Sequence, residues 1–118
     1  MTTMALTFLM AGLMQFFICL PLALRKIPMN SVYGIRIPSA YVSDQRWYDI
    51  NAYAGLRIAL WSWLASIVGA VGFFLPMKDE DIYTMVSIII VGAAFSIPVI
   101  QTMIWIRRLP PIDSKPKP

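Results

Sequence analysis

The side chains that could do chemistry lie within residues 27–55, between two long apolar stretches. Together they offer guanidinium groups, carboxylates, amides, an indole and phenols, which bind a ligand through hydrogen bonds, charge and ring contact. Only Asp44 and Asp49 could serve there as an acid or a base, so the cluster favours binding over catalysis. The candidate ligand- or partner-binding residues are Asn30, Tyr33, Gly34, Arg36, Pro38, Ser43, Asp44, Trp47 and Asn51.

The residue types that most catalytic and metal sites need are scarce. The sequence has no histidine, which excludes Ser-His-Asp triads, Cys-His pairs and histidine metal sites. Cys19 is the one cysteine, so an internal disulfide and a thiolate metal cluster are excluded. The acidic run 79–81 is interpreted as a solvated turn rather than a cation site. We therefore expect no catalytic residue, no metal and no cofactor, and an enzyme is the less favoured class.

An irregular loop is predicted to carry the first half of the cluster. Pro38 disfavours a helical conformation at Ile37, and Gly34 permits a turn. Segment 27–42 is too apolar for a fully solvated loop and too broken for a helix. We expect it to lie in the membrane interface or to re-enter the bundle, where irregular backbone must be covered by protein or by a wet cavity.

A helix is predicted to carry the second half. Ser43 can cap its first turn, and Asp44 complements the helix dipole. No strong breaker follows before residue 76, so residues 44–76 can form one helix of about 50 Å. At 100° per residue, one face holds Asp44, Trp47, Asn51 and Gly55, and the opposite face holds Arg46, Asp49, Tyr53 and Arg57.

The face with Trp47 and Asn51 is expected to turn toward the protein, where the loop must pack. Arg36 of the loop is then the expected partner of Asp44, because a guanidinium taken out of water needs a carboxylate or carbonyl oxygens. The opposite, charged face is interpreted as facing solvent or lipid headgroups.

Three uncharged stretches supply the elements around the cluster. Hydrophobic residues make up 58% and charged residues 14% of the chain, and a soluble domain of 118 residues cannot bury so much apolar surface. Each stretch can cross the ~30 Å hydrocarbon core. We predict an all-α integral membrane protein with one domain, residues 1–108, and a disordered cytoplasmic tail at 109–118. The spans are expected at about 4–24, 58–77 and 82–106, the first as a retained helix because no lysine or arginine precedes it.

Basic residues are distributed unevenly about these spans. Nine of the ten lysines and arginines lie in segment 25–57 or after residue 106, and only Lys78 lies in the acidic turn. The positive-inside rule therefore puts segment 25–57 and the C-terminus in the cytoplasm and the N-terminus outside. Because the basic residues flank the spans instead of forming one continuous cluster, we expect membrane lipid and no nucleic acid as a partner.

Small residues at helical spacing predict close packing of the spans in lipid. Gln101, the notable polar residue of the third span, is interpreted as an interhelical hydrogen bond. Self-association into a homo-oligomer is kept as an alternative, because three spans enclose little volume. The small pairs are Ala65 with Gly69, Ser66 with Ala70, and Gly92 with Ser96.

The motif segment resembles the signature of the SdpI-type immunity protein family. That signature is roughly Pro-x-Asn-x-x-x-Gly-Ile-Arg-x-Pro, then an acidic helix start, a tryptophan, a histidine or asparagine four residues on, and a glycine. The chain is similar to the C-terminal three-span module of the family's best-known member, a bacterial membrane protein that protects a cell from its own secreted killing peptide and holds a small transcriptional repressor at the membrane. The matching residues are Ile27-Pro28-Met29-Asn30-Ser31-Val32-Tyr33-Gly34-Ile35-Arg36-Ile37-Pro38, Ser43-Asp44, Trp47, Asn51 and Ala54-Gly55.

Three interpretations of the cluster stay open. It can be purely structural, because a re-entrant loop needs a paired arginine, a turn glycine and an anchoring tryptophan merely to form. It can be a binding pocket or, least favoured, a catalytic site. Our leading hypothesis is an immunity or sensor protein of the bacterial cytoplasmic membrane that binds a hydrophobic peptide toxin or a small regulatory protein through residues 27–55. The alternatives are a lipid-headgroup-binding protein or membrane enzyme with a pocket around Arg36, and an accessory subunit of a larger complex.

Overall fold

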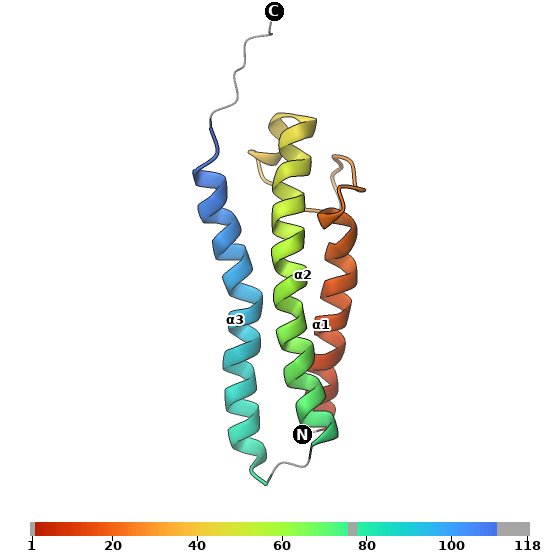
Figure 1. Ribbon diagram of the computed structural model, residues 1–118, viewed down its shortest axis with the longest axis vertical. Helices are drawn as coiled ribbons and strands as arrows, with labels where there is room; N and C mark the ends of the chain where they lie inside the picture. The colour runs from red at the N-terminus through yellow and green to blue at the C-terminus, as the bar shows by residue number, and fades with distance from the viewer. Residues whose placement is uncertain (1, 76–77, 111–118) are drawn as a thin grey trace, which may run out of the picture.

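Three long helices make up most of the computed structural model, which describes residues 2–75 and 78–110 (Figure 1). All three are long and apolar enough to cross a membrane. The predicted all-α class with three spanning helices is therefore confirmed. The elements are α1 (Thr2–Ala23), the short 3-10 helix η1 (Ala40–Val42), α2 (Asp44–Phe74) and α3 (Glu80–Arg107).

α2 lies between α1 and α3 and is the longest helix (Figure 1). Its 31 residues extend about 46 Å at 1.5 Å per residue, which exceeds the ~30 Å hydrocarbon core. The prediction of a single helix from the loop into the second span is confirmed, with its end at Phe74. The extra length leaves the first turns of α2 free to hold the loop.

Small residues line the contact between α1 and α2. Along α2 they recur at alternating steps of four and three residues, the spacing of left-handed helix packing. A Cβ atom added at Gly69 would lie 2.2 Å from the backbone nitrogen of Leu9, so the two backbones approach very closely. The buried small residues of this seam are Gly55, Ala59, Ser62, Ser66 and Gly69 on α2, and Ala5, Gly12 and Cys19 on α1.

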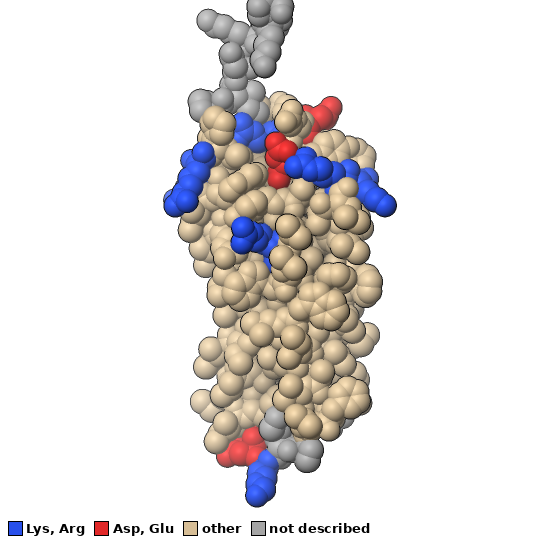
Figure 2. All heavy atoms as spheres, viewed as in Figure 1, with Lys and Arg blue, Asp and Glu red and all other residues tan. Residues whose placement is uncertain are grey.

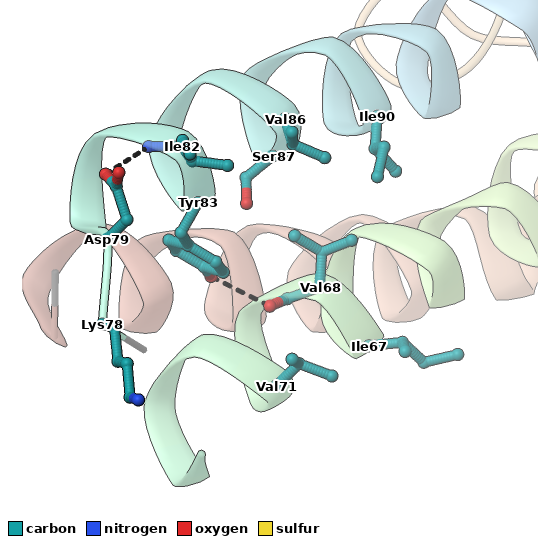
Figure 3. Close-up of a pocket in the computed structure, with 10 residues that line it drawn as sticks. All are labelled: Ile67, Val68, Val71, Lys78, Asp79, Ile82, Tyr83, Val86, Ser87 and Ile90. Carbon is teal, nitrogen blue, oxygen red and sulfur yellow. Dashed lines mark hydrogen bonds between the residues drawn. The ribbon is translucent and has the colours of Figure 1, made fainter. Parts of the chain in front are cut away.

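α3 packs on the other side of α2 through a single row of buried residues. Near the turn between the two helices, the Tyr83 ring lies over Gly72, and its hydroxyl donates a hydrogen bond of 2.9 Å to the carbonyl of Val68 (Figure 3). α3 stays helical through Pro98. The buried row is Tyr83, Ser87, Val91, Ala94, Pro98 and Thr102.

Two expectations for α3 are wrong within this chain. Gly92 and Ser96 lie on the exposed side of the helix, and a Cβ atom at Gly92 would meet no atom within 4 Å. Gln101 makes no hydrogen bond to α2, and its buried Oε1 atom has no partner among the described residues. Gly92 and Ser96 lie outside the contact because α3 packs mainly against α2, so only one of its faces is buried. Gln101 has a buried oxygen, but no described donor of α2 lies within hydrogen-bond reach of it.

The charged side chains separate to the two ends of the bundle, with an apolar surface between them (Figure 2). We call these the basic end and the acidic end. The two ends correspond to the uneven distribution of lysine and arginine in the sequence, from which the membrane orientation is predicted. Among the described residues, the acidic end holds Lys78, Asp79, Glu80 and Asp81, and the basic end holds Asp44 and Asp49 together with seven basic residues, Arg25, Lys26, Arg36, Arg46, Arg57, Arg107 and Arg108.

Candidate functional site

The candidate site is the loop between α1 and α2. It starts at the C-terminal end of α1, where an arginine adopts the conformation that ends the helix. Arg25 has a φ of 59°, in the left-handed region. Its amide donates to the carbonyl of Leu22 at 3.1 Å, and the amide of Lys26 donates to the carbonyl of Pro21 at 3.0 Å. This is a Schellman motif. The Arg25 guanidinium then pairs with the Asp49 carboxylate at 2.9 Å, which ties the end of α1 to α2.

Asn30 shapes the first turn of the loop. Its side-chain oxygen accepts hydrogen bonds from the amides of Val32 and Tyr33, at 2.9 and 2.6 Å. Its side-chain nitrogen donates to the carbonyls of Pro28 and Tyr33, at 2.7 and 3.0 Å. An aspartate would keep the acceptor but lose both donor contacts, so the amide is needed for the whole pattern. Asn30 therefore acts within the loop itself.

Asn51 docks the middle of the loop onto α2. The side chain is 1% exposed. Its oxygen accepts from the amide of Ile35, and its nitrogen donates to the carbonyl of Ile35 at 3.4 Å and to the carbonyl of Trp47 at 3.0 Å. The amide thus pairs with both backbone groups of Ile35, as a neighbouring strand would. These bonds satisfy polar groups that the irregular backbone would otherwise leave buried and unpaired.

Gly34 makes this docking possible. Its φ of +120° is a conformation that residues with a side chain rarely adopt. A Cβ atom there would lie 2.7 Å from Oδ1 of Asn51 and 3.0 Å from Cζ2 of Trp47. Glycine is therefore required at this position both by its backbone angle and by the close approach of two α2 side chains.

Trp47 is the centre of the contact between loop and helix. Its ring is fully buried and packs with Ala40 and Ile50. Its Nε1–H donates to the carbonyl of Ile27 at 2.9 Å, which fixes the start of the loop. The expectation that Trp47, Asn51 and Gly55 face the protein is confirmed, because all three are buried. Partly buried residues around this centre are Met29, Ile35, Ile37, Tyr48, Trp105, Ile106 and Leu109.

The second half of the loop turns back through Pro38. The amide of Ala40 donates to the carbonyl of Ile37 at 2.9 Å and starts η1. The Tyr41 hydroxyl donates to the carbonyl of Asn30 at 2.8 Å, and its ring centroid lies 5.5 Å from that of Trp47. Tyr41 therefore closes the loop, and the nine predicted site residues do not include it. A tyrosine between an alanine and a valine gives no sequence signal for such a long-range bond.

Ser43 caps α2 as predicted. Its Oγ accepts from the amide of Arg46 at 3.0 Å. Asp44 occupies the first turn, where its charge complements the helix dipole. Asp44 is exposed, however, although the helical projection puts it on the face of Trp47 and Asn51. The loop covers that face only from Trp47 onward, so the first turn stays open.

The expected pair between Arg36 and Asp44 is not formed. The Arg36 guanidinium donates to the carbonyl of Ser31 within the loop. Both charged side chains are exposed. The expectation assumed that Arg36 is removed from water and therefore needs a carboxylate, and its exposure removes that need.

Tyr33 is half-buried beside the turn. Burial raises the pKa of its hydroxyl above the ordinary value, so the side chain stays neutral at physiological pH. In this state the phenol can donate a hydrogen bond to a bound partner.

Residues from the end of α3 also hold the site, which the sequence did not reveal. Leu109 packs against the centre around Trp47, and the Arg46 guanidinium donates to the carbonyl of Pro110 at 2.7 Å. The first two residues of the expected disordered tail are thus in contact with the loop and α2. Residues 111–118 of that tail lie outside the described residues.

Cavities lie on both ends of the α2–α3 contact. One of them, about 440 Å³, is an apolar groove at the acidic end, away from the loop (Figure 3). Two smaller ones, about 350 and 190 Å³, lie at the basic end on either side of the Tyr53 and Trp105 rings. Within residues 2–75 and 78–110, no group of three metal-binding side chains could hold an ion. The exposed Arg36 and Asp44 side chains give the site groups that can bind through hydrogen bonds and charge.

Replacing Gly34 with alanine is expected to loosen the loop. The backbone strain alone is on the order of 1–3 kcal/mol, and the contact with Asn51 adds to it. We expect a lower free energy of unfolding in detergent and faster hydrogen exchange at the Ile35 amide, which loses its acceptor. Ser31→Ala, at an exposed position of the same loop, is the control and should change neither quantity. Unchanged exchange at Ile35 in the Gly34 variant would contradict the role assigned to this glycine.

Comparison with known proteins agrees with the geometry. A family model described as the SdpI/YfhL protein family matches residues 26–104, which include the loop, all of α2 and most of α3. No curated protein and no solved structure matches the chain. The resemblance carried by the motif is thereby confirmed, and the matched region contains all nine predicted site residues.

Proposed function

Because the chain belongs to the SdpI/YfhL protein family, we propose that it is a bacterial cell-membrane protein whose loop 27–42 binds a hydrophobic peptide or a protein partner. The observation that supports the proposal is that the motif residues form two groups, one that holds the loop inside the protein and one that is exposed. Asn30, Gly34, Trp47 and Asn51 are used inside the protein to hold the loop. Arg36, Pro38 and Asp44 are exposed on the held loop and the adjoining helix start.

Apolar side chains accompany these exposed charges. Val32 is 83% exposed although the backbone on either side is fixed by Asn30, and Tyr41 and Val42 are also exposed. An aromatic ring and an arginine are the side chains that contribute most to protein interfaces. A loop that is already ordered loses little conformational entropy when it binds, which favours affinity. The purely structural interpretation explains the buried residues and the contact of Arg36 with Ser31, but it gives no reason for the exposure of Val32 and Val42.

We further propose that the basic end faces the cytoplasm and that the N-terminus and the acidic end face outward. The positive-inside rule supports this orientation. The loop would then meet a small cytoplasmic regulatory protein directly, and a hydrophobic peptide would reach it from the lipid phase. Immunity to such a peptide and signalling through such a protein are both compatible with this arrangement.

Substitution of Arg36 by alanine is expected to abolish partner capture without unfolding the protein. A photo-crosslinking residue at Val32 in living cells should give one discrete adduct, and we expect Arg36→Ala or Asp44→Asn to remove it. Lys26→Gln is the control, because it also removes a positive charge beside the loop, from an exposed side chain that is not among the predicted site residues. A crosslinker at Ile89, exposed on α3, should not give the adduct. An undiminished adduct in a well-inserted Arg36→Ala variant would exclude the proposed surface.

The alternative is that Arg36 binds an anionic lipid headgroup. The observation in its favour is that its exposed guanidinium makes a single hydrogen bond, to Ser31, in the part of the chain that the structure describes. A lipid that copurifies in fixed stoichiometry with the wild type, and is lost in Arg36→Ala, would favour this function over a peptide or protein partner.

A further inference from the structure

One contact between α3 and α2 at the basic end is a pair of stacked rings. The centroids of Tyr53 and Trp105 lie 4.2 Å apart with an interplanar angle of 3°. Beside this stack, and away from the motif loop, lies the cavity of about 190 Å³. We call it the arginine cavity. Its lining residues are Tyr53, Arg57, Gln101, Ile104, Trp105 and Arg108.

Among residues 2–75 and 78–110, no carboxylate compensates the charge in the arginine cavity. Its lining includes two guanidinium groups, from Arg57 and Arg108, and no carboxylate. Asp49 is the closest acidic residue along this part of α2, and it lines the other cavity, paired with Arg25 at 2.9 Å. The Arg57 guanidinium lies 4.9 Å above the Tyr53 ring, which holds it in place without neutralising it. Two arginines in this arrangement are suited to a phosphate group.

The cavity also has an unused polar atom. Oε1 of Gln101 is buried and accepts no hydrogen bond from the described residues. An unpaired buried acceptor is costly, so a donor from a bound molecule would stabilise it. A ligand that fits must therefore have both a phosphate and a hydrogen-bond donor. Ile104, which lines the cavity and is 46% exposed, connects it to the apolar surface of α3.

We propose that the arginine cavity binds a phospholipid headgroup, with the phosphate between Arg57 and Arg108 and a headgroup hydroxyl or ammonium group donating to Gln101. The acyl chains would lie along the apolar surface of α3 beyond Ile104. This site is separate from the motif loop, and neither Arg36 nor Asp44 lines it. It accounts for the two arginines and for the unpaired glutamine, which the proposed partner binding at the loop leaves unexplained.

Native mass spectrometry tests whether lipid binding requires the two arginines. The whole chain is measured with phosphatidylglycerol of defined composition as the probe lipid. Arg108→Gln should weaken lipid binding by about tenfold or more, the effect expected from losing a hydrogen bond to a charged group. Arg107→Gln is the matched control: it removes the same charge from the neighbouring exposed residue, which does not line the cavity. Arg57→Lys, which keeps the charge and the fold but loses the guanidinium geometry, should also weaken binding. Equal losses for the Arg107 and Arg108 variants would overturn the proposal.

The donor requirement is tested by changing the lipid. Phosphatidylglycerol and phosphatidylethanolamine have a headgroup donor, whereas phosphatidylcholine has the phosphate without one. The wild type should prefer the first two, and Gln101→Leu should remove that preference; a preference that survives in Gln101→Leu would overturn the assigned contact. Inorganic phosphate should not displace the lipid at equal concentration, and displacement would overturn the lipid assignment. Because these variants leave the loop intact, a negative result here leaves the photo-crosslinking test at Val32 unaffected.

Discussion

Truncation of Trp47 to alanine is expected to release the loop from α2 and to lower the free energy of unfolding by about 3–5 kcal/mol. The indole is fully buried between loop and helix, so its removal leaves a cavity that the loop cannot easily fill. It also leaves the carbonyl of Ile27 without its donor. Denaturant unfolding in detergent measures the loss of stability. Limited proteolysis should show cleavage within residues 27–42 at protease levels that the wild type resists.

Trp47→Phe separates the packing from the hydrogen bond. Phenylalanine keeps most of the ring volume but has no N–H group, so we expect a smaller loss of about 1 kcal/mol. The loop should then stay protected from protease. An alanine variant that is as stable and as protease-resistant as the wild type would show that Trp47 does not hold the loop.

Replacing Gly69 with valine is the second change with a large expected effect. A Cβ atom there would lie 2.2 Å from the nitrogen of Leu9 and 2.6 Å from the carbonyl oxygen of Ala5. Both are backbone atoms, so no side-chain rotation can relieve the overlap and the helices must separate. We expect a loss at the upper end of the range for overpacking, about 3 kcal/mol, measured by denaturation in detergent followed by circular dichroism.

Gly92→Val is the matched control for Gly69→Val. It makes the same substitution at a helical glycine, but on the exposed side of α3, where nothing lies within 4 Å of the added carbon. Its effect on stability should stay within about 0.5 kcal/mol. Equal losses at the two positions would mean that helix propensity, rather than the α1–α2 seam, determines the result.

Local rules predicted much of the site. Serine at a helix start and glycine before a proline-containing segment are short-range signals, and Ser43 and Gly34 behave as these signals indicate. Helical periodicity also predicted that Trp47 and Asn51 share a buried face. These features depend on neighbours in sequence or on a single helix, so they need no knowledge of the tertiary structure.

The contacts of the two exposed charges could not be predicted in the same way. Periodicity assigns Asp44 to the face of Trp47, but it does not tell how far the loop covers that face. The predicted ion pair between Arg36 and Asp44 assumed that the loop covers this part of the face. In the structure both are exposed, and Arg36 turns back to Ser31, a contact set by the path of the loop.

Contacts between helices were the least predictable. Tyr53 and Trp105 stack although they belong to different helices and have no shared motif. Gln101 was expected to pair with a neighbouring helix, and instead its oxygen, beside two arginines, has no partner in the part of the chain that the structure describes. Small residues indicate that helices pack, but they do not tell which face of α3 meets α2, so the arginine cavity has no signal in the sequence.

The binding role of the loop is best tested first by native mass spectrometry of the wild type and of Arg36→Ala, each extracted gently from its own membrane. We expect a peptide or protein adduct of discrete mass on the wild type and none on Arg36→Ala. A lipid bound in the arginine cavity should be retained by both proteins, because Arg36 does not line that cavity. An adduct on both proteins would show that the exposed loop is not the binding surface. Two equally folded proteins without any peptide or protein adduct would show that the motif serves only to build the loop.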